Sequence, residues 1–288
     1  MYAGNDPTFC RLGPALPIHP VLIAVPHAGR DYPDALIARA TVSRDRLEGL
    51  EDRHADALIG QAVAAGVVAL VATRPRCWLD LNRDEREIDP VTVTPAPPAH
   101  QLIQSAKLRG GLGLVPRRIP GAAELWRGPM PMAEMDARIA RHHRPFHAAI
   151  ALELELIRAR FGTAMLIDLH TMPPLPRDAF AKTPQVVIGD RYGRSIATPL
   201  IERLCAAVSA SGLTVARNAP YAGGYTLDRH GAPARGVHAV QVEIDRSLYL
   251  APDMRTLGAG VAAIRTLVAA LAEAAREAMI DPAAIAAE

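Results

Sequence analysis

The chain has 288 residues, of which half are hydrophobic, and its formal net charge is +2. This apolar fraction is enough for a large core and excludes a disordered chain. The near-neutral charge gives no reason to expect a nucleic acid or a membrane surface as a partner. Three widely spaced cysteines fit neither a disulfide framework nor a CxxC metal site. With no signal peptide visible in residues 1–20, they predict a cytoplasmic protein.

Short apolar runs alternate with helical patterns along the chain. Six runs predict buried strands, at 21–25, 67–72, 164–169, 185–189, 213–216 and 238–244. Apolar residues spaced near 3.6 over 139–161, and again from Leu257 to Ala275, predict helices, the first started or kinked by Pro145. The uncharged stretch 57–73 is interpreted as a helix end plus a buried strand, not as a membrane span. The alternation predicts an α/β fold with a mostly parallel or mixed sheet.

The segment 90–131 differs from the rest of the chain. It begins with the proline-rich sequence PVTVTPAPPAH and continues with RGGLGLVPRR and PGAAELWRGPMP. A loop of this length inside a compact domain is usually functional or disordered, and a plain surface insertion is the alternative. Because no linker separates two halves, we expect a single catalytic domain over 1–288 with this long irregular excursion.

Polar residues stand at the ends of three of the predicted strands. His27 follows 21–25, His170 follows 164–169, and Glu243 lies near the end of 238–244. Ligands of open α/β sheets bind at the carboxyl ends of strands. Two imidazoles and one carboxylate are the ligand set of a hydrolytic zinc site, and a further carboxylate is available in 51–56. The local zinc signature HExxH is absent, so this pattern alone leaves a structural role for each histidine open.

Other segments offer weaker candidates. Arg83, after Asn82, can stabilise an oxyanion beside a metal, or it belongs to a solvated charge run. Cys77 lacks a partner histidine nearby, and the glycine-rich 109–113 lacks the ending of a phosphate-binding loop. The loop 218–225, with Tyr221 and a glycine pair, is either a substrate-gripping loop or a plain turn.

Seven segments in a fixed order together resemble the N-formylglutamate amidohydrolase family. They are VPHAG (25–29), EDRHADAL (51–58), LDLNR (79–83), RPFH (144–147), LIDLHTMP (166–173), NAPYAGGYT (218–226) and VHAVQVEIDRSLY (237–249). The family is related to zinc carboxypeptidases. The resemblance implies a three-layer α/β/α fold of the phosphorylase/hydrolase-like kind.

The resemblance also implies roles for single residues. His27 and His170 match metal-binding histidines, and Asp52 matches the acidic ligand, with Asp56 one helical turn on as the alternative. They would hold one Zn²⁺ per chain, for which other divalent metals can substitute. Glu243 matches the general base.

Further matched positions concern the substrate. Arg83 with Asn82 matches the arginine that meets the substrate or the oxyanion, and we expect Arg76 and Arg144 as further partners for its carboxylates. We expect Tyr221 and Gly223 to contribute from their loop.

Three positions, Ala28, Arg53 and Thr171, depart from residues common in the family, which bears on substrate identity. A second group of residues consists of candidates to support the expected ligands. Asp168 orients a ligand histidine or is structural, and His54 and His147 are candidates to support the ligands.

These expectations combine into one function. The chain is expected to hydrolyse the formyl amide of N-formyl-L-glutamate to formate and L-glutamate, in histidine degradation. The alternatives are a related zinc hydrolase for another N-acyl amino acid or a small peptide, and a non-catalytic anion-binding module. The partner is then a small molecule, and the oligomeric state is open.

Overall fold

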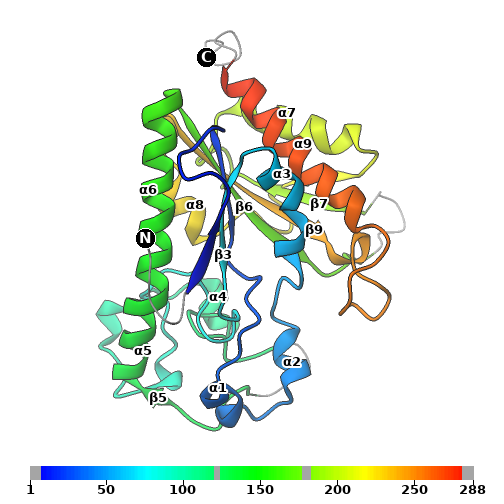
Figure 1. Ribbon diagram of the computed structural model, residues 1–288. Coiled ribbons are helices and arrows are strands. Elements are labelled where there is room, and N and C mark those ends of the chain that lie inside the picture. The colour runs from blue at the N-terminus through cyan, green and yellow to red at the C-terminus, as the bar shows by residue number, and fades with distance from the viewer. Residues whose placement is uncertain (1–7, 120–123, 177–182, 281–288) are drawn as a thin grey trace. The chain divides into compact units, whose positions relative to one another are not determined.

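The computed structural model describes residues 8–119, 124–176 and 183–280 (Figure 1). The chain divides into two compact units. The first unit takes the described parts of Met1–Cys10, Pro26–Glu51 and Val71–Ala149. The second takes those of Arg11–Val25, Asp52–Leu70 and Ile150–Glu288. The expectation of one catalytic domain over 1–288 stays a prediction.

Most of a mixed β-sheet lies in the second unit. Within the described residues, seven strands form this sheet in the order β1-β3-β2-β6-β9-β7-β8. Their bounds are β1 (Phe9–Leu12), β2 (Val21–Val25), β3 (Val68–Ala72), β6 (Ala164–Met172), β7 (Val186–Gly189), β8 (Val215–Arg217) and β9 (Val237–Asp245). β6 runs parallel to β2 and β9, β7 runs parallel to β8, and β7 is antiparallel to β9. The predicted mixed, mostly parallel sheet is confirmed.

Six of the seven described strands overlap the apolar runs of the sequence. β1 was not predicted, and β8 begins two residues later than expected and is not fully buried. β6 was expected to end at 169, before His170, but it continues to Met172. The extension follows from pairing, because all nine residues of β6 stand in register with β9, His170 beside Glu243. His170 is therefore a residue of the strand, not of the loop after it.

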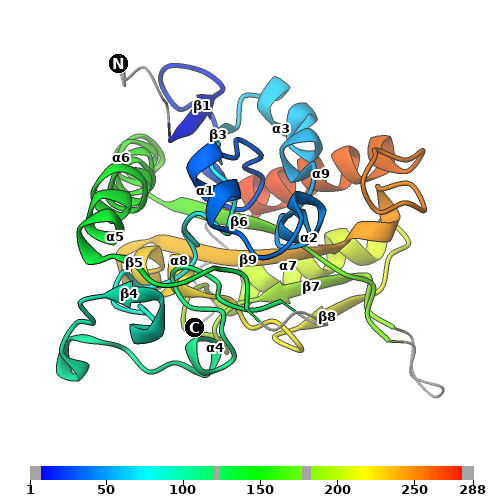
Figure 2. The same ribbon diagram turned by 90° about the horizontal axis from the view of Figure 1, so that it is seen from below.

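Helices of the second unit flank the sheet (Figures 1 and 2). The helices of the described residues in both units are α1 (Asp34–Arg39), α2 (Arg44–Glu48), α3 (Gly60–Ala64), α4 (Ala106–Arg109), α5 (Met132–Arg138), α6 (Arg144–Phe161), α7 (Thr198–Ala210), α8 (Tyr225–His230) and α9 (Val261–Ile280). In the second unit α9 packs against α3 and α7, while α8 packs against β6 and β9. No described helix is both long and apolar enough to cross a membrane.

The two predicted long helices are present with changed starts. The pattern from 139 becomes a π-helical turn, η4 (Ile139–His143), followed by α6, whose second residue is Pro145. The last helix begins at Val261, not at Leu257, which forms an isolated bridge with Leu250. The segment between Leu257 and Val261 passes close to the backbone of Leu248, because a Cβ on Gly260 would lie 1.9 Å from the Leu248 carbonyl oxygen.

The excursion 90–131 belongs to the first unit and holds only short elements. They are the 3-10 turns η2 (Pro90–Thr92) and η3 (Ala99–Gln101), helix α4, and the strands β4 (Val93–Thr94) and β5 (Met130–Pro131), which pair in parallel. Residues 120–123 of the excursion lie outside the described residues. Three further 3-10 turns complete the described chain: η1 (Ala55–Leu58), η5 (Pro233–Arg235) and η6 (Arg246–Leu248).

Candidate metal centre

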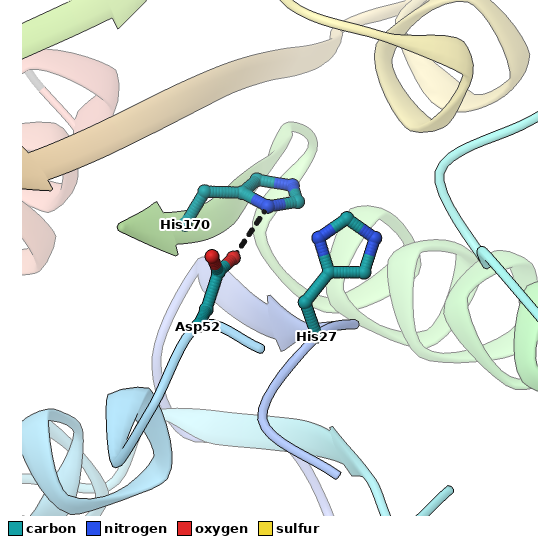
Figure 3. Close-up of side chains that lie close together, drawn as sticks. All are labelled: His27, Asp52 and His170. Atoms are coloured by element: carbon teal, nitrogen blue, oxygen red, sulfur yellow. Dashed lines mark hydrogen bonds and ion pairs between the residues drawn. The ribbon is translucent and has the colours of Figure 1, made fainter. Parts of the chain in front are cut away.

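Three buried side chains far apart in sequence come together as a group that fits a metal ion. One ligand atom each from His27, Asp52 and His170 lies within 4.8 Å of the others (Figure 3). His27 stands two residues after β2, His170 lies in β6, and Asp52 precedes the turn η1. Because β2 and β6 are parallel neighbours, both histidines come from the same end of the sheet.

The His170 imidazole lies between two carboxylates. Its Nδ1 is 2.9 Å from Oδ2 of Asp52, and its Nε2 is 3.0 Å from Oδ2 of Asp168. Burial lowers the pKa of His170, but Asp168 and Asp52 outweigh that effect and hold the pKa well above its usual range. Asp168 Oδ1 is buried and accepts no hydrogen bond from the described residues. This concentration of negative charge favours a cation at the group.

The His27 ring is oriented by a second buried carboxylate. Its Nε2 is 2.7 Å from Oδ1 of Asp80, a fully buried residue. Burial raises the pKa of the Asp80 carboxyl, but Arg76 and Arg83 outweigh it and hold that pKa well below its usual range. The ionised Asp80 accepts from Nε2–H, so Nδ1 is the ring atom that can bind a metal.

The two candidate aspartates differ in their position in the structure. Asp52 is buried and belongs to the group, whereas Asp56 is half-buried in η1 and does not. This geometry favours Asp52 as the acidic ligand.

Glu243 lies beside His170 in the sheet. The two residues are register partners on the parallel strands β9 and β6, and side chains in register on neighbouring strands share a face. The buried Glu243 carboxylate accepts a hydrogen bond of 2.8 Å from Nε2 of Gln241. Asp168 and Gln241 are register partners two residues earlier, so this face carries a block of four polar residues.

Asn82, Arg83 and Arg76 gather around Asp80 in the first unit. Asp80 accepts from the Asn82 backbone N–H at 2.9 Å and from Arg76 Nε at 2.8 Å. Arg83 is buried, and its Nη2 is 3.7 Å from Asp80. Its guanidinium also donates to the carbonyls of Leu112 and Asn82, which fixes its position.

Two buried histidines hold the backbone of the same segment. His143, at the end of the π turn, binds the Arg83 carbonyl oxygen through Nε2 at 2.8 Å. His147, one turn further, binds the Leu81 carbonyl oxygen at the same distance. His147 therefore supports the Arg83 segment, and its expected role in supporting the ligands stays a prediction. His54, also expected to support the ligands, has its Nε2 3.0 Å from the Arg255 carbonyl oxygen, and its supporting role stays a prediction as well.

Arg144, which was expected to bind a substrate carboxylate, is paired with a carboxylate of the chain itself. The side chain of Arg144 is 64% exposed and forms a two-pronged ion pair with Glu85. An exposed arginine neutralised by its own partner has little attraction left for a substrate carboxylate. This pairing gives no support to the expected contact between Arg144 and the substrate, which stays a prediction.

Tyr221 and Gly223 lie in the loop between β8 and α8. This loop is held to Arg191, whose backbone N–H donates to Ala222 at 2.9 Å and whose Nη1 donates to Gly223 at 3.3 Å. Gly223 has φ +97°, a conformation that favours glycine. These contacts give the loop a defined conformation, and the role of Tyr221 in binding stays a prediction.

Arg246 was missed by the sequence reasoning. Its Nη2 donates to Oδ1 of Asp52 at 3.0 Å, and its Nε donates to the Thr171 hydroxyl at the same distance. The signal available was its place just after the strand that carries Glu243, within VHAVQVEIDRSLY.

Comparisons with known proteins identify the family of the chain. The family model described as N-formylglutamate amidohydrolase matches residues 19–250. The N-formylglutamate deformylases of Pseudomonas putida and Pseudomonas aeruginosa are each 30% identical over 239 residues, covering 80% of this chain and 82% of theirs.

Solved structures give the same result. The crystal structure of N-formylglutamate amidohydrolase from Ralstonia eutropha JMP134 is 32% identical, covers 94% of this chain and 99% of its own, and has a TM-score of 0.85. The gene product Atu2144 of Agrobacterium tumefaciens, at 20% identity and a TM-score of 0.60 over 93% of this chain and 95% of its own, shares the fold. The chain is a hydrolase and belongs to the N-formylglutamate amidohydrolase family.

Proposed function

We propose that this chain hydrolyses the formyl amide of N-formyl-L-glutamate to formate and L-glutamate, using one Zn²⁺ held by His27, Asp52 and His170. The observation that carries the proposal is the buried His-Asp-His group, with ligand atoms within 4.8 Å, in a chain similar to named deformylases. With the family resemblance, we also assign the reaction to histidine degradation in the cytoplasm.

The donor set fits the metal. Two neutral imidazoles and one carboxylate are the usual protein ligands of catalytic zinc, and buried carboxylates at Asp80 and Asp168 bind the far nitrogens of both rings. A zinc ion bound there supplies a water molecule with a pKa near neutrality and polarises the formyl carbonyl. Co²⁺, Mn²⁺ or Fe²⁺ can serve the same ligands.

Glu243 is the proposed general base. Its carboxylate takes a proton from the attacking water and later gives that proton to the amide nitrogen, so that glutamate leaves as an amine. Two features support this role: Glu243 is the register partner of His170, and Gln241 holds one of its oxygens. A carboxylate restrained in this way keeps its position through both proton transfers.

The proposed role of Arg83 is electrostatic. Its buried, fixed guanidinium stabilises the negative charge that develops on the carbonyl oxygen. Arg76 and Asn82 are the proposed contacts for the substrate carboxylates, with Tyr221 and Gly223 contributing from their loop. Arg76 is half-buried and donates from Nε to Asp80, which places its guanidinium in the same cluster as Asn82 and Arg83.

A formate-release assay on the purified chain tests the proposal. N-formyl-L-glutamate should release formate, while N-acetyl-L-glutamate and N-formyl-L-leucine should react much more slowly. Release from either analogue at the rate of N-formyl-L-glutamate would assign the chain to another N-acyl amino acid. No reaction with any of the three would contradict deformylation.

The variant E243Q tests the chemistry at Glu243. We expect kcat to fall by about 10²–10⁴, the usual contribution of a positioned acid–base group, while the bound metal is unchanged. The control is E153Q, which alters a buried glutamate that pairs with Arg11 and should keep kcat. If the chain only binds anions, the wild type will bind N-formyl-L-glutamate without releasing formate. E243Q will then bind it as tightly as the wild type does.

A further inference from the structure

We propose that Arg246 is a positioning residue of the metal centre, which holds Asp52 so that only one of its carboxylate oxygens faces His170. The inference rests on the proposed metal site and adds a residue outside its ligand set. It is carried by contacts within the second unit alone.

The pairing of β9 with β6 places Arg246 near Asp52. β9 ends at Asp245, which is in register with Met172, the last residue of β6. The Asp245 carboxylate then accepts from the backbone N–H of Ser247 at 2.8 Å and from its hydroxyl at 2.7 Å. These bonds fix the turn η6, so its first residue, Arg246, lies beside the end of β6.

Two contacts to Thr171 fix the direction of the guanidinium. Nε donates to the Thr171 hydroxyl at 3.0 Å, and Nη2 donates to the Thr171 carbonyl at 3.2 Å. The same Nη2 donates to Oδ1 of Asp52 at 3.0 Å, and the side chain is only 14% exposed. A planar fork held at two points presents its remaining N–H in one direction, which is what an orienting residue requires.

As a consequence, the two carboxylate oxygens of Asp52 have different partners. Oδ1 is bound by Arg246, and Oδ2 is 2.9 Å from His170 Nδ1. Asp168 accepts from Nε2 of His170, which places the lone pair of the neutral ring on Nδ1, toward Asp52. The two atoms offered to a metal are thus Asp52 Oδ2 and His170 Nδ1.

The backbone next to Asp52 is held separately. The hydroxyl of the fully buried Tyr249 donates to the Arg53 carbonyl at 2.7 Å. Loss of the Arg246 side chain therefore releases the Asp52 carboxylate while this backbone contact stays. The expected defect is a carboxylate that rotates, not a segment that moves.

A purely electrostatic role and a positioning role of Arg246 predict opposite changes in metal affinity when this residue is removed, so a binding measurement distinguishes them. A guanidinium near a divalent cation repels it, so a purely electrostatic role predicts tighter metal binding once Arg246 is removed. A positioning role predicts weaker binding, since partners of metal ligands typically contribute about 10–100-fold in affinity.

The experiment is a Zn²⁺ titration of the metal-free full chain in competition with a chromophoric chelator, without substrate. We expect R246M to raise the Kd for Zn²⁺ by about 10–100-fold. R246K keeps the charge but cannot reach Thr171 and Asp52 together, and should raise the Kd by about tenfold or more. The control R265M removes an arginine that donates to the Ala57 carbonyl within η1, and it should leave the Kd unchanged.

A Kd for R246M equal to or below that of the wild type overturns the proposal. If R246M does not fold, the pair T171V and T171S decides. T171V removes the hydroxyl that anchors Nε and should weaken Zn²⁺ binding by about 2–10-fold, while T171S retains it and should bind as the wild type. Equal Kd values for T171V and T171S then overturn the role of Arg246.

The titration separates this inference from the proposed function. A wild type that binds Zn²⁺ but releases no formate overturns the substrate and leaves Arg246 in place. A wild type that binds no Zn²⁺ overturns the metal centre and the role of Arg246 together.

Discussion

His238 shows how a single buried histidine sets the pH dependence of stability away from the metal centre. It lies in β9, burial lowers its pKa to about 4, and its Nδ1 accepts from the Ala197 backbone N–H at 3.4 Å. The folded chain therefore keeps this imidazole neutral, whereas the unfolded chain protonates it near pH 6.5.

This difference predicts the sign of a pH effect. Because the unfolded state binds the proton more readily, the contribution of His238 to stability is complete above pH 6.5 and is lost as the pH falls toward 4. At about 1.4 kcal/mol for each pH unit between the two pKa values, the full loss is about 3 kcal/mol. Denaturant unfolding of wild type and H238Q at pH 7 and 4.5 measures it, and the variant should lose less stability. Parallel losses in both proteins would refute the assignment.

Among single residues, the sequence indicated those whose chemistry is unusual at their position. It did not indicate residues whose role depends on a contact with a distant part of the chain. His27, His170 and Glu243 were found because ionisable groups at strand ends are unusual. Arg246 was missed because its partner Asp52 is 194 positions away in the chain. The pairing of Arg144 with Glu85 was not visible in sequence for a related reason, since an arginine in a motif does not reveal which anion it will pair with.

The loop after β2 depends on a glycine that the structure explains. A Cβ on Gly29 would lie 2.0 Å from the Arg74 carbonyl oxygen and 2.4 Å from its carbon. Both atoms are backbone, so G29A must displace the chain two residues after His27.

We expect G29A to lower the melting temperature by several degrees and to weaken Zn²⁺ binding about tenfold, through displacement of His27. Thermal unfolding and metal titration measure the two effects. G60A is the matched control, because a Cβ on Gly60, in α3, meets nothing within 4 Å and should be tolerated. A G29A chain as stable and as tightly metal-binding as G60A would show that the loop has room to adjust.

The elements themselves were largely predictable, and their ends were not. Most of the apolar runs became buried strands because a strand covered on both faces needs apolar residues on both, whereas the run at 213–216 became the partly exposed edge strand β8. Where a strand stops depends on its neighbour, and β6 continues to Met172 because β9 keeps pairing with it. The antiparallel direction of β7 and the π turn at Ile139–His143 also arise from packing between distant segments, which no local pattern records.

For the whole molecule, the α/β class followed from the alternation of strands and helices, but the division into two units did not. The chain passes between them several times, so that the first unit alone draws on three separate stretches. A sequence search for one linker cannot find such a division. The family, by contrast, was visible in sequence because seven motifs keep their order over 25–249.

The central claim is that the His27–Asp52–His170 group holds the metal on which deformylation depends. The most direct test measures metal content of the purified chain by mass spectrometry together with formate release from N-formyl-L-glutamate, before and after chelation. The account predicts about one Zn²⁺ per chain, loss of formate release with a chelator, recovery with added Zn²⁺, and neither metal nor turnover in H170A. Formate release that survives complete removal of metal, or a chain that binds no metal even when Zn²⁺ is added, would contradict it.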